Sequence, residues 1–153
     1  MAVFYVHSFM PGQELAAHRS YRVTISGEVV KAQNTHICLE FNVPPPHPDI
    51  SYRCERWSRQ PGGDLAQFRD DRFLLGTSSG GDGVFSADVI LSCPTPARVL
   101  MTGQSVYWNA EADIFSEVVA GHASTPVPIT SIAFSLSTDG TIFVPAHIGV
   151  TPI

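Results

Sequence analysis

Hydrophobic and polar residues alternate with a period of two along much of the chain, which is typical of strands with one buried face. The clearest run covers residues 35–43, where Ile37, Leu39, Phe41 and Val43 share one side and His36, Cys38, Glu40 and Asn42 the other. Shorter runs of the same kind cover residues 21–25, 49–57, 72–75, 85–93, 98–101, 104–109, 132–136 and 141–144. Because no segment longer than about two turns has a helical period, the pattern predicts an all-β protein.

Turn-forming residues separate these runs. Thr102-Gly103 and Asp139-Gly140 each lie between two apolar runs and predict hairpin turns, and Gly27 predicts a bend. Residues 60–71 predict a loop with one helical turn at 64–69. Two further loops are predicted where proline, or glycine and serine, are concentrated, at residues 44–48 and 76–83. Short strands at this spacing predict a sandwich of two sheets or a barrel.

Composition narrows the class of protein. The chain has 153 residues, which predicts one domain covering residues 1–153. Hydrophobic residues make up 44% and the net charge is −5, so intrinsic disorder is excluded. A basic stripe is absent from the sequence, so we expect no nucleic-acid partner. No apolar run approaches the length that spans a bilayer, so we expect no membrane span.

The cysteines and histidines predict neither a disulfide framework nor a metal centre. Cys38, Cys54 and Cys93 are odd in number and none forms a CxxC pair, which favours free thiols in a reducing compartment. We therefore expect a cytoplasmic protein, with secretion by an unconventional route as the alternative. None of the six histidines is paired with a second ligand at metal-binding spacing, and no cofactor is expected.

The order and spacing of the predicted strands resemble those of the galectins. Tyr21–Val29 follows that family's pattern of strand, Gly, Glu and Val, and Asp49–Glu55 resembles the strand that carries its sugar-binding residues. The other segments that carry the resemblance are Phe9–Leu15, Thr35–Val43, Leu74–Ser78, Arg98–Asn109 and Ile132–Val144. The resemblance implies a two-sheet jelly-roll sandwich with a glycan groove on one concave sheet, and a glycan or glycoprotein as partner.

Polar and aromatic side chains on the solvent side of the central strands are the candidate ligand-binding residues. Arginine and glutamate can bind sugar hydroxyls in bidentate fashion, and Trp57 can stack on the apolar face of a sugar ring. Thr77 is included because it lies where the family has its Val-x-Asn-Ser strand end. The full set is His36, Glu40, Arg53, Glu55, Trp57 and Thr77. The alternative is a solvated sheet face with cross-strand ion pairs. On a later strand, Tyr107 and Trp108 point to opposite faces, and simple packing is the favoured interpretation.

The family's sugar-binding residues are not retained here. Arg53, Glu55 and Trp57 occupy the alternate positions of its His-x-Asn-x-Arg strand, and no tryptophan follows Ser78–Gly83 where the family has its stacking ring. We therefore predict a lectin with a diverged glycan site. The alternative function is an interaction module that has lost sugar binding, and the alternative partner is a second copy in a homodimer paired through edge strands.

Catalysis is not expected. Gly76–Gly80 matches the G-x-S-x-G pattern of esterases, with Ser78 as its nucleophile, but that motif needs a helix after the serine and a β pattern follows instead. A pair of catalytic carboxylates would have to face each other across a cleft. The aspartates considered for such a pair are better interpreted as turn formers, and they are Asp64, Asp70, Asp71, Asp82 and Asp88.

Overall fold

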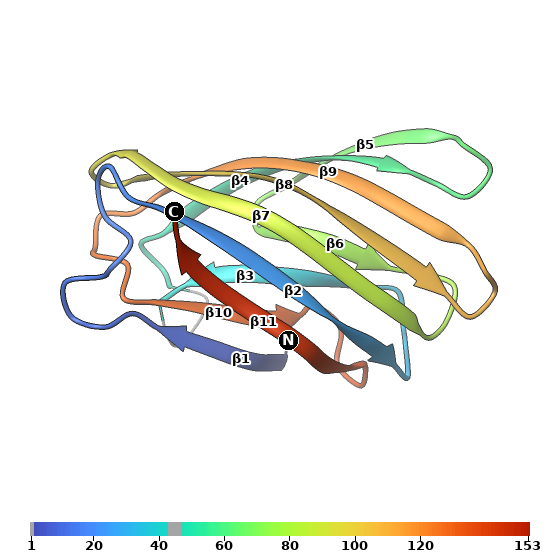
Figure 1. The fold of residues 1–153 in the computed structure, drawn as a ribbon. Coiled ribbons are helices and arrows are strands. Elements are labelled where there is room, and N and C mark those ends of the chain that lie inside the picture. Colours follow the sequence, from blue (N-terminus) through green and yellow to red (C-terminus); the bar gives the residue numbers. More distant parts are fainter. Residues whose placement is uncertain (1, 43–46) are drawn as a thin grey trace.

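The computed structural model describes residues 2–42 and 47–153, which form eleven strands (Figure 1). The strands are β1 (Ala2–Ser8), β2 (Ser20–Val30), β3 (Thr35–Phe41), β4 (Ser51–Arg59), β5 (Leu65–Asp70), β6 (Phe73–Ser78), β7 (Gly83–Thr95), β8 (Arg98–Asn109), β9 (Ile114–Ser124), β10 (Ser131–Leu136) and β11 (Ile142–Pro152). The prolines at 44–46 and the last residue of the 35–43 run lie outside the described residues.

The strands form two antiparallel sheets that pack face to face. The smaller sheet has the order β1-β10-β3-β6, and the larger has the order β11-β2-β7-β8-β9-β4-β5. The described ranges contain no helix, and hence none that could cross a membrane. The all-β, two-sheet architecture is confirmed, while the jelly-roll connectivity stays a prediction.

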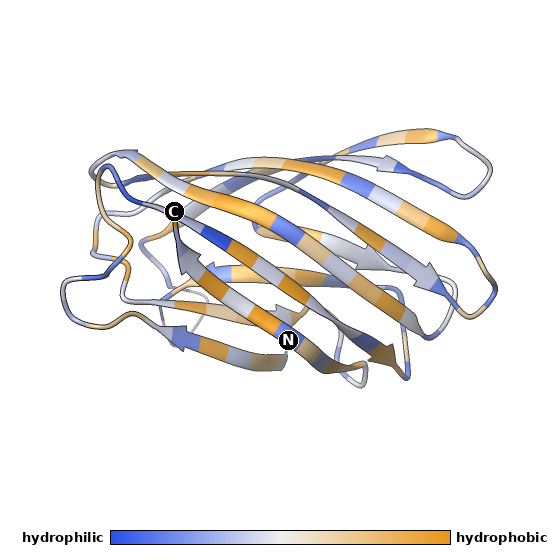
Figure 2. Ribbon diagram, in the orientation of Figure 1, coloured by the Kyte–Doolittle hydropathy of each residue, from blue (hydrophilic) through white to orange (hydrophobic). Residues whose placement is uncertain are grey.

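The core lies between the two sheets and comes from the alternation itself. Along β2 the residues Tyr21, Val23, Ile25, Gly27 and Val29 are buried, and the residues between them are exposed or half-buried. Figure 2 shows the same alternation of hydrophobic and hydrophilic residues along the other strands of the larger sheet. The largest fully buried side chains include Phe41, Phe73, Phe134, Leu75, Leu91, Met101 and Tyr107. At roughly 25 cal/mol per Å² of buried apolar surface, these rings and branched chains supply the main stabilisation.

Three glycine positions differ from the sequence-based expectation. Gly27 and Gly103 lie inside β2 and β8, so the bend and the hairpin turn predicted there were wrong. Both sit where neighbouring backbone comes close, because an added Cβ would lie 2.3 Å from the Val144 carbonyl oxygen at Gly27 and 2.3 Å from that of Asp88 at Gly103. Asp139-Gly140 does form a turn, but it connects β10 in one sheet to β11 in the other, so the two strands do not form a hairpin.

Residues 65–70 form a strand, so the predicted loop with a helical turn was wrong. β5 pairs along its whole length with β4, with Arg56 opposite Phe68 and Arg59 opposite Leu65. β5 is held by its pairing with β4, and no residue of β5 is fully buried. Its sequence therefore shows little alternation of hydrophobic and polar residues. The strands at 2–8 and 114–124 were likewise not anticipated.

The two sheets are unequal in width, and this shapes both sides of the sandwich. On one side β1 and β11 lie close together, with the rings of Phe4 and Phe143 centred 4.8 Å apart. On the other side β5 forms the far edge of the larger sheet and no residue in it is fully buried (Figure 1). The inner face of β4 and β5 therefore overhangs β6, the edge strand of the smaller sheet.

Candidate functional site

Three of the six candidate residues share the face of the seven-stranded sheet that points away from the smaller sheet, which we call the outer face. Along β4, Arg53, Glu55 and Trp57 alternate with the buried Cys54 and Arg56, as the period of two predicts. Trp57 is 42% exposed although it is one of the largest apolar side chains of the chain. This part of the expected site therefore exists as one surface.

Glu55 on that surface has a cross-strand partner. Its Oε1 lies 3.0 Å from Nε of Arg69 on β5, and the two side chains are 33% and 68% exposed. Exposed ion pairs of this kind contribute at most about 1 kcal/mol. Arg53 lies opposite His122 of β9. The ion pair is what a solvated sheet face would also contain, so these contacts alone do not indicate a ligand.

The other three candidates, His36, Glu40 and Thr77, belong to the four-stranded sheet and do not join the first three. Glu40 on β3 is only 3% exposed, and its Oε1 accepts a hydrogen bond from Nη2 of Arg72 at 3.0 Å. The polar side of β3 was expected to meet water, yet Cys38 and Asn42 are buried there too. The expectation of one shared face fails because alternation fixes which side of a strand a residue occupies but not which sheet the strand joins.

His36 and Thr77 contact a buried arginine of the other sheet. Nδ1 of His36 lies 3.1 Å from Oγ1 of Thr77, which accepts a hydrogen bond from Nη1 of Arg56 at 2.8 Å. Nη1 also donates to Oε2 of Glu117 at 2.7 Å. Burial lowers the pKa of His36, and the nearby charge of Arg56 lowers it further. His36 is therefore neutral near pH 7.

A neutral, half-buried His36 predicts a pH dependence of stability. Because its pKa is lower in the folded chain, the unfolded chain binds the proton first as the pH falls below its ordinary value of about 6.5. The stabilisation is fully present above that pH and is lost as the pH falls toward the lowered value. His36→Gln is expected to reduce the loss of unfolding free energy between about pH 7 and pH 5, measured by urea denaturation. An unchanged loss in the variant would contradict this account.

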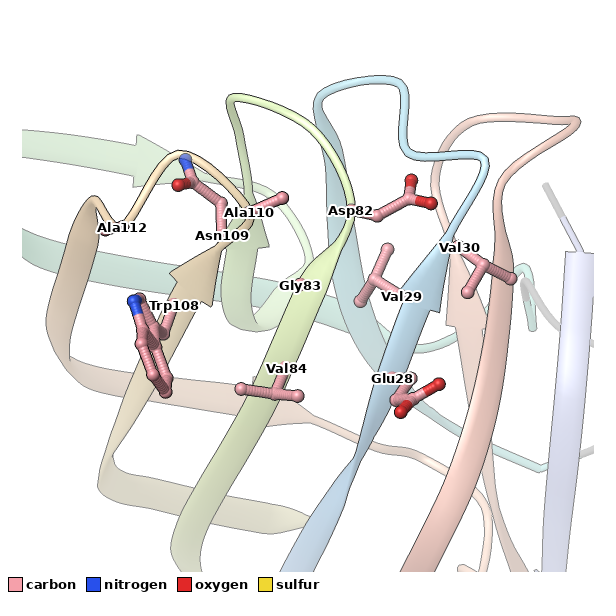
Figure 3. A pocket seen from close by; sticks show the side chains of 10 residues that line it. All are labelled: Glu28, Val29, Val30, Asp82, Gly83, Val84, Trp108, Asn109, Ala110 and Ala112. Atoms are coloured by element: carbon pink, nitrogen blue, oxygen red, sulfur yellow. The ribbon is translucent and has the colours of Figure 1, made fainter.

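Trp108 is the largest apolar side chain that the sequence did not assign to a site. Tyr107 is 1% exposed and Trp108 is 55% exposed, so the pair does divide between the core and the surface. Strand pairing places Trp108 beside Val84 of β7, and Val84 beside Glu28 of β2. Figure 3 shows these three side chains following one another across the outer face.

An open hollow of about 500 Å³ lies at this end of the sheet, and Trp108 forms one side of it. Gly83 is paired with Asn109 of β8 and with Val29 of β2, and an added Cβ there would meet the Trp108 carbonyl oxygen at 2.3 Å. Asp82 and Glu28 place carboxylates on the rim, and both are exposed. The hollow therefore combines an aromatic wall with hydrogen-bond acceptors.

The rim of this hollow is fixed by hydrogen bonds. Oδ1 of Asn109 accepts from the backbone N–H groups of Glu111 and Asp113, both at 3.0 Å, and its Nδ2 donates to the Ser79 carbonyl at 2.9 Å. Oδ1 of Asp82 accepts from the backbone N–H of Ala32 at 2.9 Å. The turn after β8 is thus tied to the loop between β6 and β7, which is itself tied to the loop after β2.

A second open hollow, of about 740 Å³, lies over the middle of the same face. Arg22 and Asp88 form an ion pair there, with Nε donating to Oδ1 at 2.9 Å. The hydrogen bond and charge of Arg22 hold the pKa of Asp88 below its ordinary value. Thr102 and Gln104 of β8 are exposed beside them. The centre of the face therefore offers both donors and acceptors.

Both tryptophans of the chain lie on the outer face. Trp57 is paired with Val118 of β9, and Val118 with Gln104 of β8, four positions from Trp108. With about 3.3 Å per residue and about 4.8 Å between strands, the backbone positions of the two tryptophans lie about 16 Å apart. The second hollow lies beside the line that joins them. Alternation along β8 places Tyr107 and Trp108 on opposite faces, but it does not tell which of the two faces the core.

The other reactive side chains considered from the sequence, the three cysteines and Ser78, are buried. Cys38, Cys54 and Cys93 are buried and unpaired, and burial raises the pKa of Cys38 and of Cys93 to about 11. Ser78 is fully buried at the end of β6, and a turn and β7 follow it in place of the helix that the esterase motif needs. Within residues 2–42 and 47–153, no group of His, Cys, Asp or Glu side chains is arranged to hold a metal ion.

Neither a family model, nor a curated protein, nor a solved structure matches this chain. The resemblance to the galectins therefore stays a prediction, and the function has to be argued from the surface itself.

Proposed function

We propose that this protein is a carbohydrate-binding β-sandwich, a lectin whose diverged glycan site is the outer face of the seven-stranded sheet. The observation that carries the proposal is the placement of both tryptophans, half-exposed, on one sheet face, with the hydrogen-bonding side chains of Gln104 and Thr102 on the same strand as Trp108. The partner is a glycan or a glycoprotein.

The chemistry of the outer face suits a glycan of several sugar units. An indole stacks on the apolar C–H face of a sugar ring, and its rigid ring system loses little entropy on binding. Gln104 and Thr102 supply neutral donors and acceptors, and Glu28 an acceptor, within reach of ring hydroxyls. A span of about 16 Å between the backbone positions of the two tryptophans corresponds to a chain of a few sugars rather than one.

The account predicts that Trp108→Ala weakens glycan binding about tenfold or more, because a buried aromatic anchor commonly contributes at least about 1–2 kcal/mol. Trp57→Ala is expected to weaken it as well. The measurement is calorimetric titration with a glycan that the wild-type protein binds. Quenching of tryptophan fluorescence gives a second readout, because each single variant keeps one indole on the face.

The matched control is Met10→Ala. Met10 is 68% exposed and belongs to neither sheet, so its loss removes exposed apolar surface away from the outer face. The affinity of the Met10→Ala variant for the glycan is expected to equal that of the wild type. Equal affinities for the control and both tryptophan variants would overturn the placement of the site.

The second candidate function is a protein-interaction module, and a specific observation favours it. Aliphatic side chains on the outer face are more than two-fifths exposed, namely Val84, Ile90, Leu100, Val106 and Val118. Contiguous exposed apolar surface is a common feature of protein interfaces. A dimer detected by light scattering, and dissociated by Val106→Asp on this face, would favour that function over glycan binding.

A further inference from the structure

A pocket of about 270 Å³ lies on the opposite face of β4, where the seven-stranded sheet overhangs β6. Arg56, which follows the outward-facing Glu55, points inward here. Its guanidinium is surrounded by side chains of both sheets: Asp70 of β5, Glu117 of β9 and Thr77 of β6. The rings of Phe68 and Phe115 and the imidazole of His36 complete the lining that matters chemically.

Among residues 2–42 and 47–153, the guanidinium of Arg56 is bonded through two of its three nitrogens, Nε and Nη1. Its Nε donates to Oδ2 of Asp70 at 3.0 Å, and its Nη1 donates to both Glu117 and Thr77. An arginine has five N–H donors, so within the described part of the chain the two on Nη2 remain for another acceptor. The central carbon of the guanidinium lies 4.9 Å from the centre of the Phe68 ring. Asp70 and Glu117 each use one carboxylate oxygen in these bonds, which leaves each a second acceptor.

The histidine adds a donor. Oγ1 of Thr77 accepts from Arg56 and has one proton of its own, which it can donate to Nδ1 of His36. A neutral His36 that accepts at Nδ1 carries its proton on Nε2. With Thr77 as the donor, the chain from Glu117 through Arg56 and Thr77 orders the imidazole and leaves Nε2 as a donor.

A purely structural role explains this cluster poorly. The side chains of Arg56 and Glu117 are 4% and 3% exposed, and burying such a pair gains little over well-packed apolar residues. Here donors and acceptors instead line a pocket beside two phenylalanine rings. A few polar groups placed among apolar ones is the usual composition of a small-molecule site.

The charges select the class of ligand. Arg56 carries one positive charge against the two carboxylates of Asp70 and Glu117, so the cluster is negative by one unit and disfavours anions. A cation would have to lie beside Arg56, which opposes it. A neutral ligand with several hydroxyl groups can use the donors and acceptors together. The volume lies below the roughly 300–1,000 Å³ of pockets for drug-sized ligands, so the ligand is small.

We propose that this pocket binds one neutral sugar unit of monosaccharide size, at a site separate from the outer face. The inference rests on the proposed function only for the ligand class, because the geometry belongs to different residues on the other side of β4. The two phenylalanine rings provide the apolar contact, and Arg56, Asp70, Glu117 and His36 bind the hydroxyls.

The test fills the pocket without touching the ion pairs. Ser79 lines the pocket from the loop after β6 and is only partly exposed. Its backbone carbonyl accepts the hydrogen bond from Asn109 at the rim of the first hollow. Ser79→Tyr places a ring in the pocket, and Ser79→Ala is the matched control. Neutral methyl glycosides are titrated one by one, and binding is followed by saturation-transfer NMR and by the ring nitrogen resonances of His36. The expected result is a shift of those resonances in the wild type and in Ser79→Ala, and at least a tenfold weaker response in Ser79→Tyr.

Two further variants separate this proposal from the proposed function. The double variant Trp57→Ala/Trp108→Ala is expected to keep the shift of the His36 resonances on addition of methyl glycosides and to lose glycan binding at the outer face. Asp70→Asn, at a side chain 22% exposed, is expected to weaken the response and serves if Ser79→Tyr does not fold. Glycan binding that needs the tryptophans with no His36 response to any methyl glycoside would overturn this inference and leave the proposed function standing. A His36 response to inorganic phosphate alone would also overturn it.

Discussion

Replacing Arg56 by methionine is expected to lower the free energy of unfolding by about 3–5 kcal/mol, the usual cost of breaking a buried ion pair by removing one partner. The substitution leaves the carboxylate of Glu117 almost completely buried without its cation. Asp70 and Thr77 lose their hydrogen-bond donor at the same time. Urea denaturation of the wild type and the variant at neutral pH measures the difference.

Two companion variants identify the cause. Arg69→Met breaks the exposed pair with Glu55 on the outer face and is expected to change stability by at most about 1 kcal/mol. The double variant Arg56→Met/Glu117→Leu removes both buried charges and is expected to recover much of the loss. A double variant as unstable as the single one would show that packing of the arginine stem, and not the stranded charge, is responsible.

Gly103→Ala is the second substitution with a large expected effect. Gly103 lies in the middle of β8, and an added Cβ would come within 2.3 Å of the Asp88 carbonyl oxygen and 2.6 Å of Cα of Val89. Both are backbone atoms of β7, so no side chain can rotate away and the central pair of strands must separate. Overpacking costs about 1–3 kcal/mol and occasionally more, and we expect about 3 kcal/mol or above here.

Gly12→Ala is the control for the loss of a glycine. No atom lies within 4 Å of the position of its Cβ, and the cost comes from its φ of +83°, which is roughly 1–2 kcal/mol. The measurement is again urea denaturation. A Gly103→Ala protein as stable as Gly12→Ala would contradict the continuous β8 and would favour a turn at Thr102-Gly103.

The sequence predicts those features of the fold that depend on local backbone geometry. A period of two assigned β3 and the inner and outer faces of β4, because alternation depends only on backbone geometry. It did not assign β5, whose partner is β4 rather than the core, and it interpreted Gly103 as a turn. A glycine required by the close approach of a neighbouring strand looks, in the sequence, like a glycine required by a turn.

The same limit explains what happened to the candidate site. Arg53, Glu55 and Trp57 were grouped correctly because they belong to one strand. His36 and Thr77 were grouped with them, yet strand pairing places these two in the other sheet, where they meet Arg56. Contacts between strands far apart in the sequence decide sheet membership, and no spacing along the chain encodes them.

The central claim is that the outer face binds a glycan, and a glycan array tests it most directly. The array is probed with the wild-type protein and with Trp57→Ala/Trp108→Ala, with lactose as a competitor. The account predicts selective binding of a defined set of glycans by the wild type and its loss in the double variant. Competition by lactose would indicate a site that still accepts β-galactosides, and indifference to it a diverged specificity. An array without selective binding by the wild-type protein would contradict the account and leave protein interaction as the function of this face.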